Sequence, residues 1–152
     1  MGVEDVRAYF EENGLPYEVR EMDASTETVE MAARALGVEP ALIAKTLAFE
    51  LKDRAILVVT KGDAKIDNKK FKQQFQGKAK MMSPDEVMEA TGHPVGGVCP
   101  FGLRQEIDIY LDESLRQFEK VYPAAGSQNS CIEITPEELC RITGAQWVDV
   151  CK

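Results

Sequence analysis

The 152-residue chain lacks several features that whole classes of protein require. It has one histidine, and none of its four cysteines, Cys99, Cys131, Cys140 and Cys151, forms a CxxC pair. Structural zinc sites normally need such local pairs, so we expect no metal and no other cofactor. No apolar run approaches the roughly 20 residues that span a bilayer, and no basic-then-apolar leader opens the chain. These absences predict a cytoplasmic protein with reduced cysteines and no membrane partner.

Positive charge is also scarce, and it is unevenly distributed. Lys and Arg total 18 against 26 Asp and Glu, which gives a formal charge of −8 and excludes a uniformly basic nucleic-acid binder. Residues 61–80 nevertheless hold seven lysines and only two aspartates, an excess of five positive charges, so the remainder of the chain carries −13. A block of one sign on an opposite background indicates either a polyanionic partner or a solvated helix face. The candidates for phosphate contacts in this block are Lys61, Lys65, Lys69, Lys70 and Lys72.

Hydrophobic periodicity and turn residues predict about seven strands and five helices in one domain, residues 1–152. Helices are expected at 3–12, from a cap at Ser25 or Thr26 to residue 36, at 68–76, and after the Ser-Pro and Thr-Pro starts at 83 and 135. Strands are expected at 17–22, 45–51, 55–60, 78–82, 107–111, 118–123, 130–134 and 146–150. The order lacks a regular βαβ repeat, which predicts an α+β (mixed α/β) fold. We expect a central curved mixed β-sheet, or a partly closed barrel, flanked by helices.

Two glycine loops are candidates for a site. The first, Gly92–Gly102 (GHPVGGVCPFG), holds four glycines and two prolines, and the second lies around Gly126. Adjacent amides in such loops can donate to an oxyanion, although tight structural turns have the same composition. Lys45 opens an apolar strand, so its amine either snorkels outward or enters a pocket. A Cys99–His93 nucleophile pair is a further alternative, with no third group to orient it.

The order of these motifs resembles that of one family. Lys45-Thr46-Leu47, the GxPxGGxxPFG stretch, Leu111-Asp112-Glu113-Ser114-Leu115 and Ala125-Gly126 occur in the order found in the YbaK family. These are aminoacyl-tRNA deacylases related to the editing domain inserted in bacterial prolyl-tRNA synthetases. The resemblance covers nearly the whole chain and implies a mixed α/β domain around a curved sheet.

The resemblance also implies an activity and a set of residues. The activity is hydrolysis of the ester of mischarged tRNA, most typically tRNA for proline carrying Cys, Ala or another small amino acid, with prolyl-tRNA synthetase as a possible partner and no role for DNA. The family's invariant lysine matches Lys45, and Gly97 and Gly126 are the candidates for oxyanion stabilisation. Water, the terminal ribose hydroxyl or a substrate thiol would attack, without a protein nucleophile. The substrate-binding set would be Met22, Thr28, Gly96, Pro100, Phe101, Ser127 and Cys131.

The chain departs from the family pattern in the amino-acid pocket. Cys131 stands where an acid is expected, and Met22 and Thr28 stand where some relatives place aromatic residues. These differences leave the edited amino acid open, because one methylene changes discrimination by only about 1–3 kcal/mol. A catalytically inactive module that binds tRNA or a synthetase is the alternative to a trans-editing deacylase.

Overall fold

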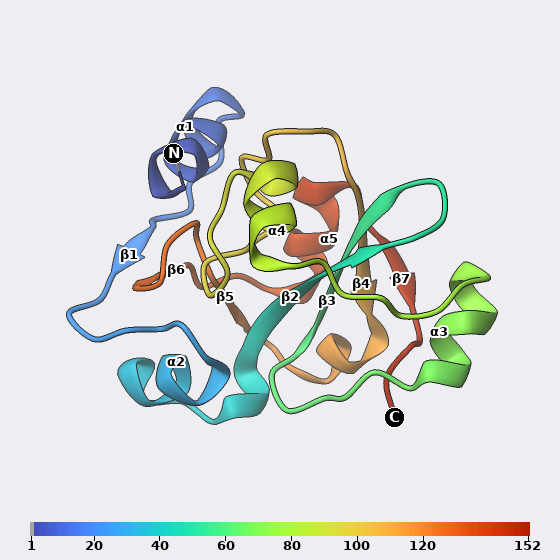
Figure 1. The fold of residues 1–152 in the computed structure, drawn as a ribbon. Helices are drawn as coiled ribbons and strands as arrows, with labels where there is room; N and C mark the ends of the chain where they lie inside the picture. Colours follow the sequence, from blue (N-terminus) through green and yellow to red (C-terminus); the bar gives the residue numbers. More distant parts are fainter. Residues whose placement is uncertain (1) are drawn as a thin grey trace.

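A computed structural model describes residues 2–152 as five α-helices, two 3₁₀ turns and seven strands (Figure 1). The helices are α1 (Val3–Glu12), α2 (Val29–Leu36), α3 (Asn68–Phe75), α4 (Pro84–Thr91) and α5 (Pro136–Thr143), and the 3₁₀ turns are η1 (Pro40–Leu42) and η2 (Glu113–Gln117). The strands are β1 (Arg20–Glu21), β2 (Ile43–Glu50), β3 (Ala55–Lys61), β4 (Asp108–Asp112), β5 (Tyr122–Pro123), β6 (Ser130–Cys131) and β7 (Gln146–Val148).

The central sheet is mixed and open. Its order is β5-β2-β3-β4-β7, and β1 and β6 form a separate two-stranded sheet. The β2–β3 hairpin is antiparallel, whereas the pairs β2–β5, β3–β4 and β4–β7 are parallel. Because β5 and β7 at the two edges do not pair, the sheet does not close. The predicted mixed sheet is therefore confirmed, and of the two expected forms the structure has the open sheet rather than a barrel.

Local capping chemistry places the helices. Ser83 caps α4 in a full capping box, with its hydroxyl accepting from the N–H of Glu86 and the Glu86 carboxylate accepting from the N–H of Ser83. The Thr135 hydroxyl caps α5, and the Asp67 carboxylate accepts from two N–H groups at the start of α3. Because each cap satisfies otherwise unpaired N–H groups, these three helix starts follow directly from the sequence.

Several predicted elements differ in the structure. The strands expected at 17–22, 118–123 and 130–134 are reduced to two residues each. Helix α2 is capped by Thr28, whose hydroxyl accepts from the N–H of Met31, and not by Ser25 or Thr26. Residues 78–82 do not form a strand in the sheet, since they pair with β2 only through the isolated bridge between Phe49 and Met81.

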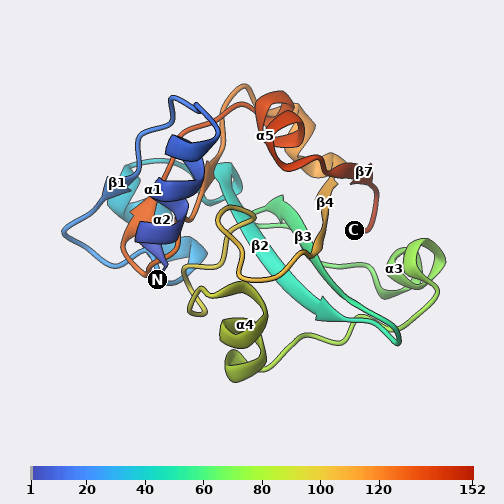
Figure 2. The same cartoon turned by 90° about the horizontal axis from the view of Figure 1, so that it is seen from above.

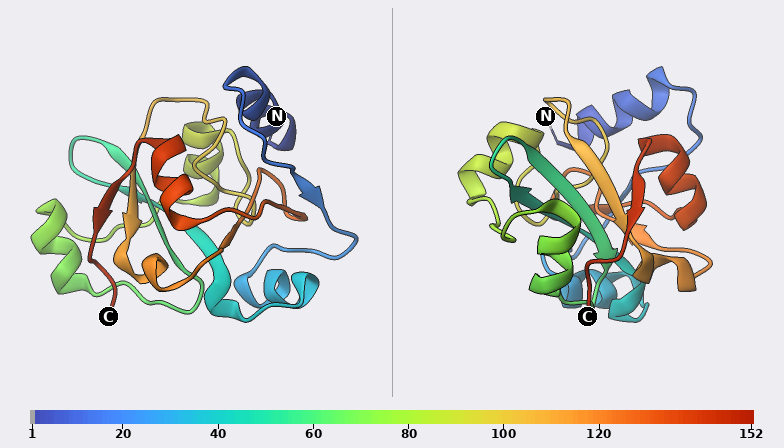
Figure 3. Two further views of the ribbon diagram at one scale, coloured as in Figure 1. Left: turned by 180° about the vertical axis from the view of Figure 1, so that it is seen from behind. Right: turned by 90° about the vertical axis from the view of Figure 1, so that its right-hand side faces the viewer.

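The helices divide between the two faces of the sheet. Phe71 and Phe75 of α3 pack with Phe49 and Val58 on one face. Helix α4 packs through Val87 on the other face, as do α1 and α5 further along. Figure 2 shows α3 on one side of the β2–β3 pair and α1 and α4 on the other. Figure 3 shows the two termini at opposite ends of the molecule. The α4 face of β2 is the one that carries the cavity described next.

Candidate active site

A cavity of about 290 Å³ lies along β2 and is the most enclosed of the described pockets. Its size is at the low end of the roughly 300–1,000 Å³ of small-molecule sites. Most of the lining is aliphatic and comes from α2, β2 and α4. The glycine loops contribute Val95, Gly96 and Val98 on one side and Ala124, Ser130 and Cys131 on the other.

The two glycine loops pack backbone against backbone beside this cavity. The N–H of Gly126 donates to the carbonyl oxygen of Gly97 at 2.9 Å. A Cβ on Gly97 would lie 2.6 Å from the backbone nitrogen of Ser127, and one on Gly96 would lie 2.8 Å from the Glu27 side chain. Contacts this short leave no room for a side chain at either position. The structure therefore brings Gly96, Gly97 and Gly126 together, as the motif suggested.

The amides of Gly97 and Gly126 are already engaged within the loops. The Gly97 N–H donates to the carbonyl oxygen of Pro94 at 2.9 Å, and the Gly126 N–H is used as described above. Among residues 2–152, the N–H groups of Gly96 and Val98 have no protein acceptor, and both residues line the cavity. The N–H groups without an acceptor are thus on the residues that flank Gly97, not on Gly97 itself. The sequence contains no signal for this difference, because it depends on how the turn closes.

Lys45 lies on β2 at the cavity, but its amine points to a neighbouring loop. The Nζ atom donates to the carbonyl oxygen of Ala64 at 2.6 Å, and the side chain is half-buried. Burial lowers the pKa of Lys45, and nearby Cys151 and Asp63 partly oppose that shift. Strand alternation groups Lys45 with Leu47, which packs against the α3 cluster. The amine is therefore neither in bulk solvent nor directed at the glycine loops.

Two buried threonine hydroxyls at the cavity wall have no hydrogen-bond partner. Thr26 is 6% exposed, and its Oγ1 atom and that of Thr46 are unpaired within residues 2–152. Both residues line the cavity. A buried hydroxyl without a partner costs about 1–3 kcal/mol, so both mark positions that a bound polar group would satisfy. Sequence reasoning missed both.

The outer edge of β2 is also open beside Thr46. Strand β5 pairs with β2 only at Ile43 and Ala44, and the next contact along this edge is the hydrogen bond from Met82 N–H to the Ala48 carbonyl, 3.0 Å. No strand pairs with this edge between those points in the described chain. Alternation directs the backbone groups of Thr46 toward the gap.

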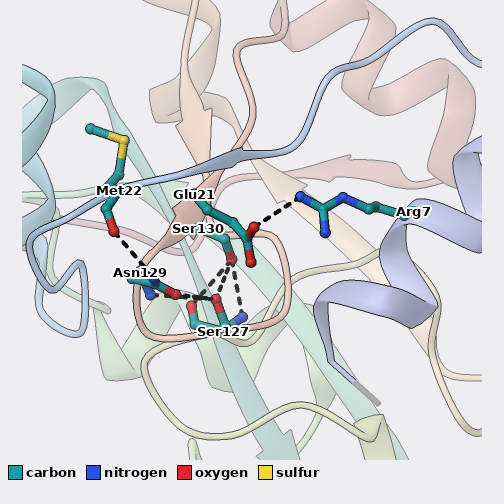
Figure 4. A network of polar contacts seen from close by, with 6 residues as sticks. All are labelled: Arg7, Glu21, Met22, Ser127, Asn129 and Ser130. Carbon is teal, nitrogen blue, oxygen red and sulfur yellow. Dashed lines mark hydrogen bonds and ion pairs between the residues drawn. The ribbon is translucent and has the colours of Figure 1, made fainter.

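The predicted substrate-binding residues divide into two groups. Thr28, Gly96 and Cys131 line the cavity. Met22 and Ser127 do not; they belong to the adjoining network of Figure 4, in which the Ser127 hydroxyl oxygen lies 2.8 Å from Asn129 Oδ1 and 2.7 Å from Ser130 Oγ. The amide of Asn129 donates to the Met22 carbonyl at 3.1 Å. This network fixes the second glycine loop, and Ser130 is its one member that lines the cavity.

Pro100 and Phe101 lie away from the cavity. Phe101 is fully buried in the core against Phe10, with ring centroids 5.1 Å apart, and Pro100 lines a separate groove next to Tyr9. Their position in the glycine motif reflects packing of the loop onto α1.

The Cys99–His93 alternative is excluded by burial. Neither side chain has exposed surface. Both contact the carbonyl oxygen of Phe101, His93 through Nε2 at 2.6 Å and Cys99 through Sγ at 3.7 Å. Burial raises the pKa of Cys99 to about 12 and lowers the pKa of His93. A thiol that stays protonated and cannot reach a substrate is no nucleophile.

Some of the five candidate lysines of the basic block are already engaged in contacts within the protein. Lys61 lies 3.5 Å from Asp63, and Lys70 contacts Asp149 at 3.1 Å and the Cys151 carbonyl at 2.9 Å. Lys65, Lys69 and Lys72 are exposed. Figure 1 places α3 at the opposite end of the sheet from β1 and β6. The lysines of α3 therefore do not border the glycine loops.

Metal and membrane features can be stated for residues 2–152. These residues contain no group of three or more His, Cys, Asp or Glu side chains arranged to hold a metal ion. None of their helices has the length and apolar character needed to cross a membrane.

Comparison with known proteins gives consistent matches. The model of a family described as "Aminoacyl-tRNA editing domain" matches residues 23–142. The chain is 50% identical over 154 residues to YwhH of Bacillus subtilis, a protein named as uncharacterized, covering 100% of this chain and 98% of that protein. It is 28% identical to EbsC of Enterococcus faecalis, provisionally named a Cys-tRNA(Pro)/Cys-tRNA(Cys) deacylase, covering 92% of this chain and 88% of EbsC.

A solved structure matches along almost the entire chain. It is described provisionally as a trans-editing enzyme for prolyl-tRNA synthetase, and it superposes with a TM-score of 0.91 at 34% identity. The match covers 99% of this chain and 96% of that structure. The arrangement of helices and strands described above is therefore shared with that protein.

Proposed function

The chain belongs to the family of aminoacyl-tRNA editing domains, and we propose that it hydrolyses the ester bond of mischarged tRNA in trans. The carrier is tRNA for proline, and the acyl group is cysteine, alanine or another small amino acid. The observation that carries this proposal is the small cavity bordered by two glycine loops that are locked to each other by the Gly126–Gly97 hydrogen bond. A rigid set of main-chain donors beside an enclosed cavity suits stabilisation of a tetrahedral intermediate.

The chemistry requires no protein nucleophile. The oxygen of water attacks the ester carbonyl carbon, and negative charge develops on the carbonyl oxygen. Attack by the neighbouring ribose hydroxyl moves the acyl group to that oxygen, and water must then attack the new ester in the same way. When water attacks, the bond to the ribose oxygen breaks, that oxygen takes a proton, and free amino acid leaves uncharged tRNA. The N–H groups of Gly96 and Val98 are the donors we assign to the developing charge, since those of Gly97 and Gly126 are engaged. Gly97 and Gly126 then act by holding the loop in position.

Lys45 remains our candidate for the essential side chain. Its proposed role is to hold the terminal phosphate or the ester carbonyl, for which the amine must leave the Ala64 carbonyl. Lys45→Met keeps the aliphatic stem and removes the charge. We expect kcat/KM to fall by at least about 100-fold, the usual effect of losing one such stabilising group, with a shift in Tm of only a few degrees. Lys120→Met, which removes an exposed lysine paired with Glu133, is the control. A Lys45→Met enzyme with the control's rate would remove Lys45 from the mechanism.

A panel of charged tRNAs tests the function itself. Purified protein is incubated with tRNA for proline charged separately with cysteine, alanine and proline, and release of each amino acid is followed. We expect hydrolysis of one mischarged species and sparing of the proline ester. Absence of turnover on every mischarged species, with tRNA binding retained, would support the alternative of an inactive binding module. Repeating the panel with prolyl-tRNA synthetase present tests that enzyme as a partner.

A further inference from the structure

A second concave surface, at the turn of the β2–β3 hairpin, carries most of its charge as cations. This groove of about 1,080 Å³ lies between the hairpin turn and the end of α3. Four basic side chains and two carboxylates line it, on a chain whose formal charge is −8. We call it the basic groove; its charged residues are Lys52, Arg54, Lys78 and Lys80, with Glu50 and Asp53.

The cations of the basic groove differ in how they are held. Arg54 is fixed by Asp108 and by the Tyr110 hydroxyl at 2.9 Å. The Lys80 amine lies 3.5 Å from Glu50, and its side chain is 71% exposed. Lys52 and Lys78 are exposed and form no ion pair within residues 2–152. Because exposed ion pairs contribute little, Lys80 can exchange its partner for another anion at small cost.

One short segment of the chain contributes to both the basic groove and the cavity. Lys80 is followed by Met81 and Met82, which line the cavity, and Met81 is 58% exposed. Two backbone hydrogen bonds hold this segment beside β2, from Glu50 N–H to the Lys80 carbonyl at 2.9 Å and from Met82 N–H to the Ala48 carbonyl at 3.0 Å. In Figure 1 it forms part of the connection from α3 to α4. The same short segment therefore supplies Lys80 to the basic groove and Met81 and Met82 to the cavity.

The opposite side of the cavity is acidic. Glu27 lines the cavity and Glu30 lies in the first turn of α2. A polyanion whose end enters the cavity is repelled along α2 and attracted along the basic groove.

We propose that the basic groove binds backbone phosphates of the tRNA acceptor strand while the aminoacylated 3′ end occupies the cavity. This inference rests on the proposed function, and it assigns the direct phosphate contacts to Lys52, Lys78 and Lys80 rather than to the lysines of α3. Contacts of this kind position the RNA without reading its sequence. Lysine serves here as a mobile point charge for phosphate.

Two triple variants with the same change in charge test the proposal. The groove variant combines Lys52→Gln, Lys78→Gln and Lys80→Gln, and the control combines Lys65→Gln, Lys69→Gln and Lys72→Gln. Deacylation of the best mischarged tRNA is measured over a series of salt concentrations, together with binding of uncharged tRNA and Tm. We expect the groove variant to raise KM with little change in kcat. Its log–log salt slope should fall by about 2, since each single-strand contact contributes roughly 0.7.

The outcomes separate the two proposals. A control variant that matches the groove variant in KM and salt slope would show an effect of net charge alone and would overturn the groove assignment. If the wild-type protein is active and the groove variant has the same KM and salt slope, the groove assignment is also overturned, whereas the proposed deacylase function stands. If the wild-type protein hydrolyses no charged tRNA, the proposed function fails. Binding of uncharged tRNA then still decides the groove, because that measurement does not depend on hydrolysis.

Discussion

Replacing Gly126 with alanine probes the contact between the two glycine loops. Gly126 has φ of +98°, and an added Cβ would lie 2.5 Å from the carbonyl carbon of Gly2 and 2.7 Å from the nitrogen of Val3. Both are backbone atoms at the start of α1, so no flexible side chain can move aside. Either α1 or the loop must shift, which would lengthen the hydrogen bond from Gly126 to Gly97.

The expected cost follows from three contributions. A positive φ in a residue with a side chain costs about 1–2 kcal/mol, and overpacking against fixed neighbours adds about 1–3 kcal/mol. Loss of the hydrogen bond adds about 0.5–1.5 kcal/mol. We therefore expect Gly126→Ala to lower the free energy of unfolding by about 2.5–6.5 kcal/mol, a large part of the roughly 5–15 kcal/mol of an average domain.

Gly144→Ala provides the matched control. Gly144 has φ of +68°, and nothing lies within 4 Å of its added Cβ. It therefore pays only the conformational cost of about 1–2 kcal/mol. Urea denaturation of both variants measures the difference, and deacylation rates are compared where each is fully folded. If the two variants differ by less than about 1 kcal/mol, the close packing of the loop against α1 is refuted.

Two further predictions concern buried polar groups. Because burial lowers the pKa of His93, the unfolded chain binds a proton that the folded protein does not. The free energy of unfolding should fall as pH drops below about 6.5, with a slope of up to about 1.4 kcal/mol per pH unit. Urea titrations of His93→Gln at several pH values should lack this pH-dependent loss of stability. Identical pH dependence in the wild type and the variant would contradict the prediction. Thr46→Val replaces an unpartnered hydroxyl with a methyl group and should raise the free energy of unfolding by about 1 kcal/mol; a lowered Tm would show that the hydroxyl has a partner.

The sequence predicts the helix starts better than the short strands. A cap such as Ser83 acts within four residues, so its signature is local and readable. Strands β5 and β6 span only two residues each. Their extent depends on partners distant in the chain, such as the bridge between Val121 and Ile134. Segment 78–82 has strand-like composition, yet its place beside β2 provides only one bridge.

The sequence predicts which residues form the glycine loops, but it does not predict which of their N–H groups are free to bind. Composition predicts a loop that presents amides to a ligand, and Gly96, Gly97 and Gly126 do meet in the structure. Which amide is free depends on closure of the turn from Gly97 to Pro94, a 2.9 Å hydrogen bond that no spacing rule encodes. The same holds for the Thr26 hydroxyl, whose lack of a partner is a property of the assembled wall.

The location of the cavity, by contrast, follows from the alternation of large and small side chains along β2. Lys45, Leu47 and Phe49 are large and share the face that packs against α3 and the neighbouring loop, and Lys45 and Leu47 are also among the residues that line the cavity. Ala44, Thr46 and Ala48 alternate with them and are small, so the other face leaves space that no side chain of β2 occupies. A strand with large residues on one face and small ones on the other marks a hollow on the small side. The signal in the Lys45-Thr46-Leu47 motif is thus carried as much by Thr46 and its small neighbours as by the lysine.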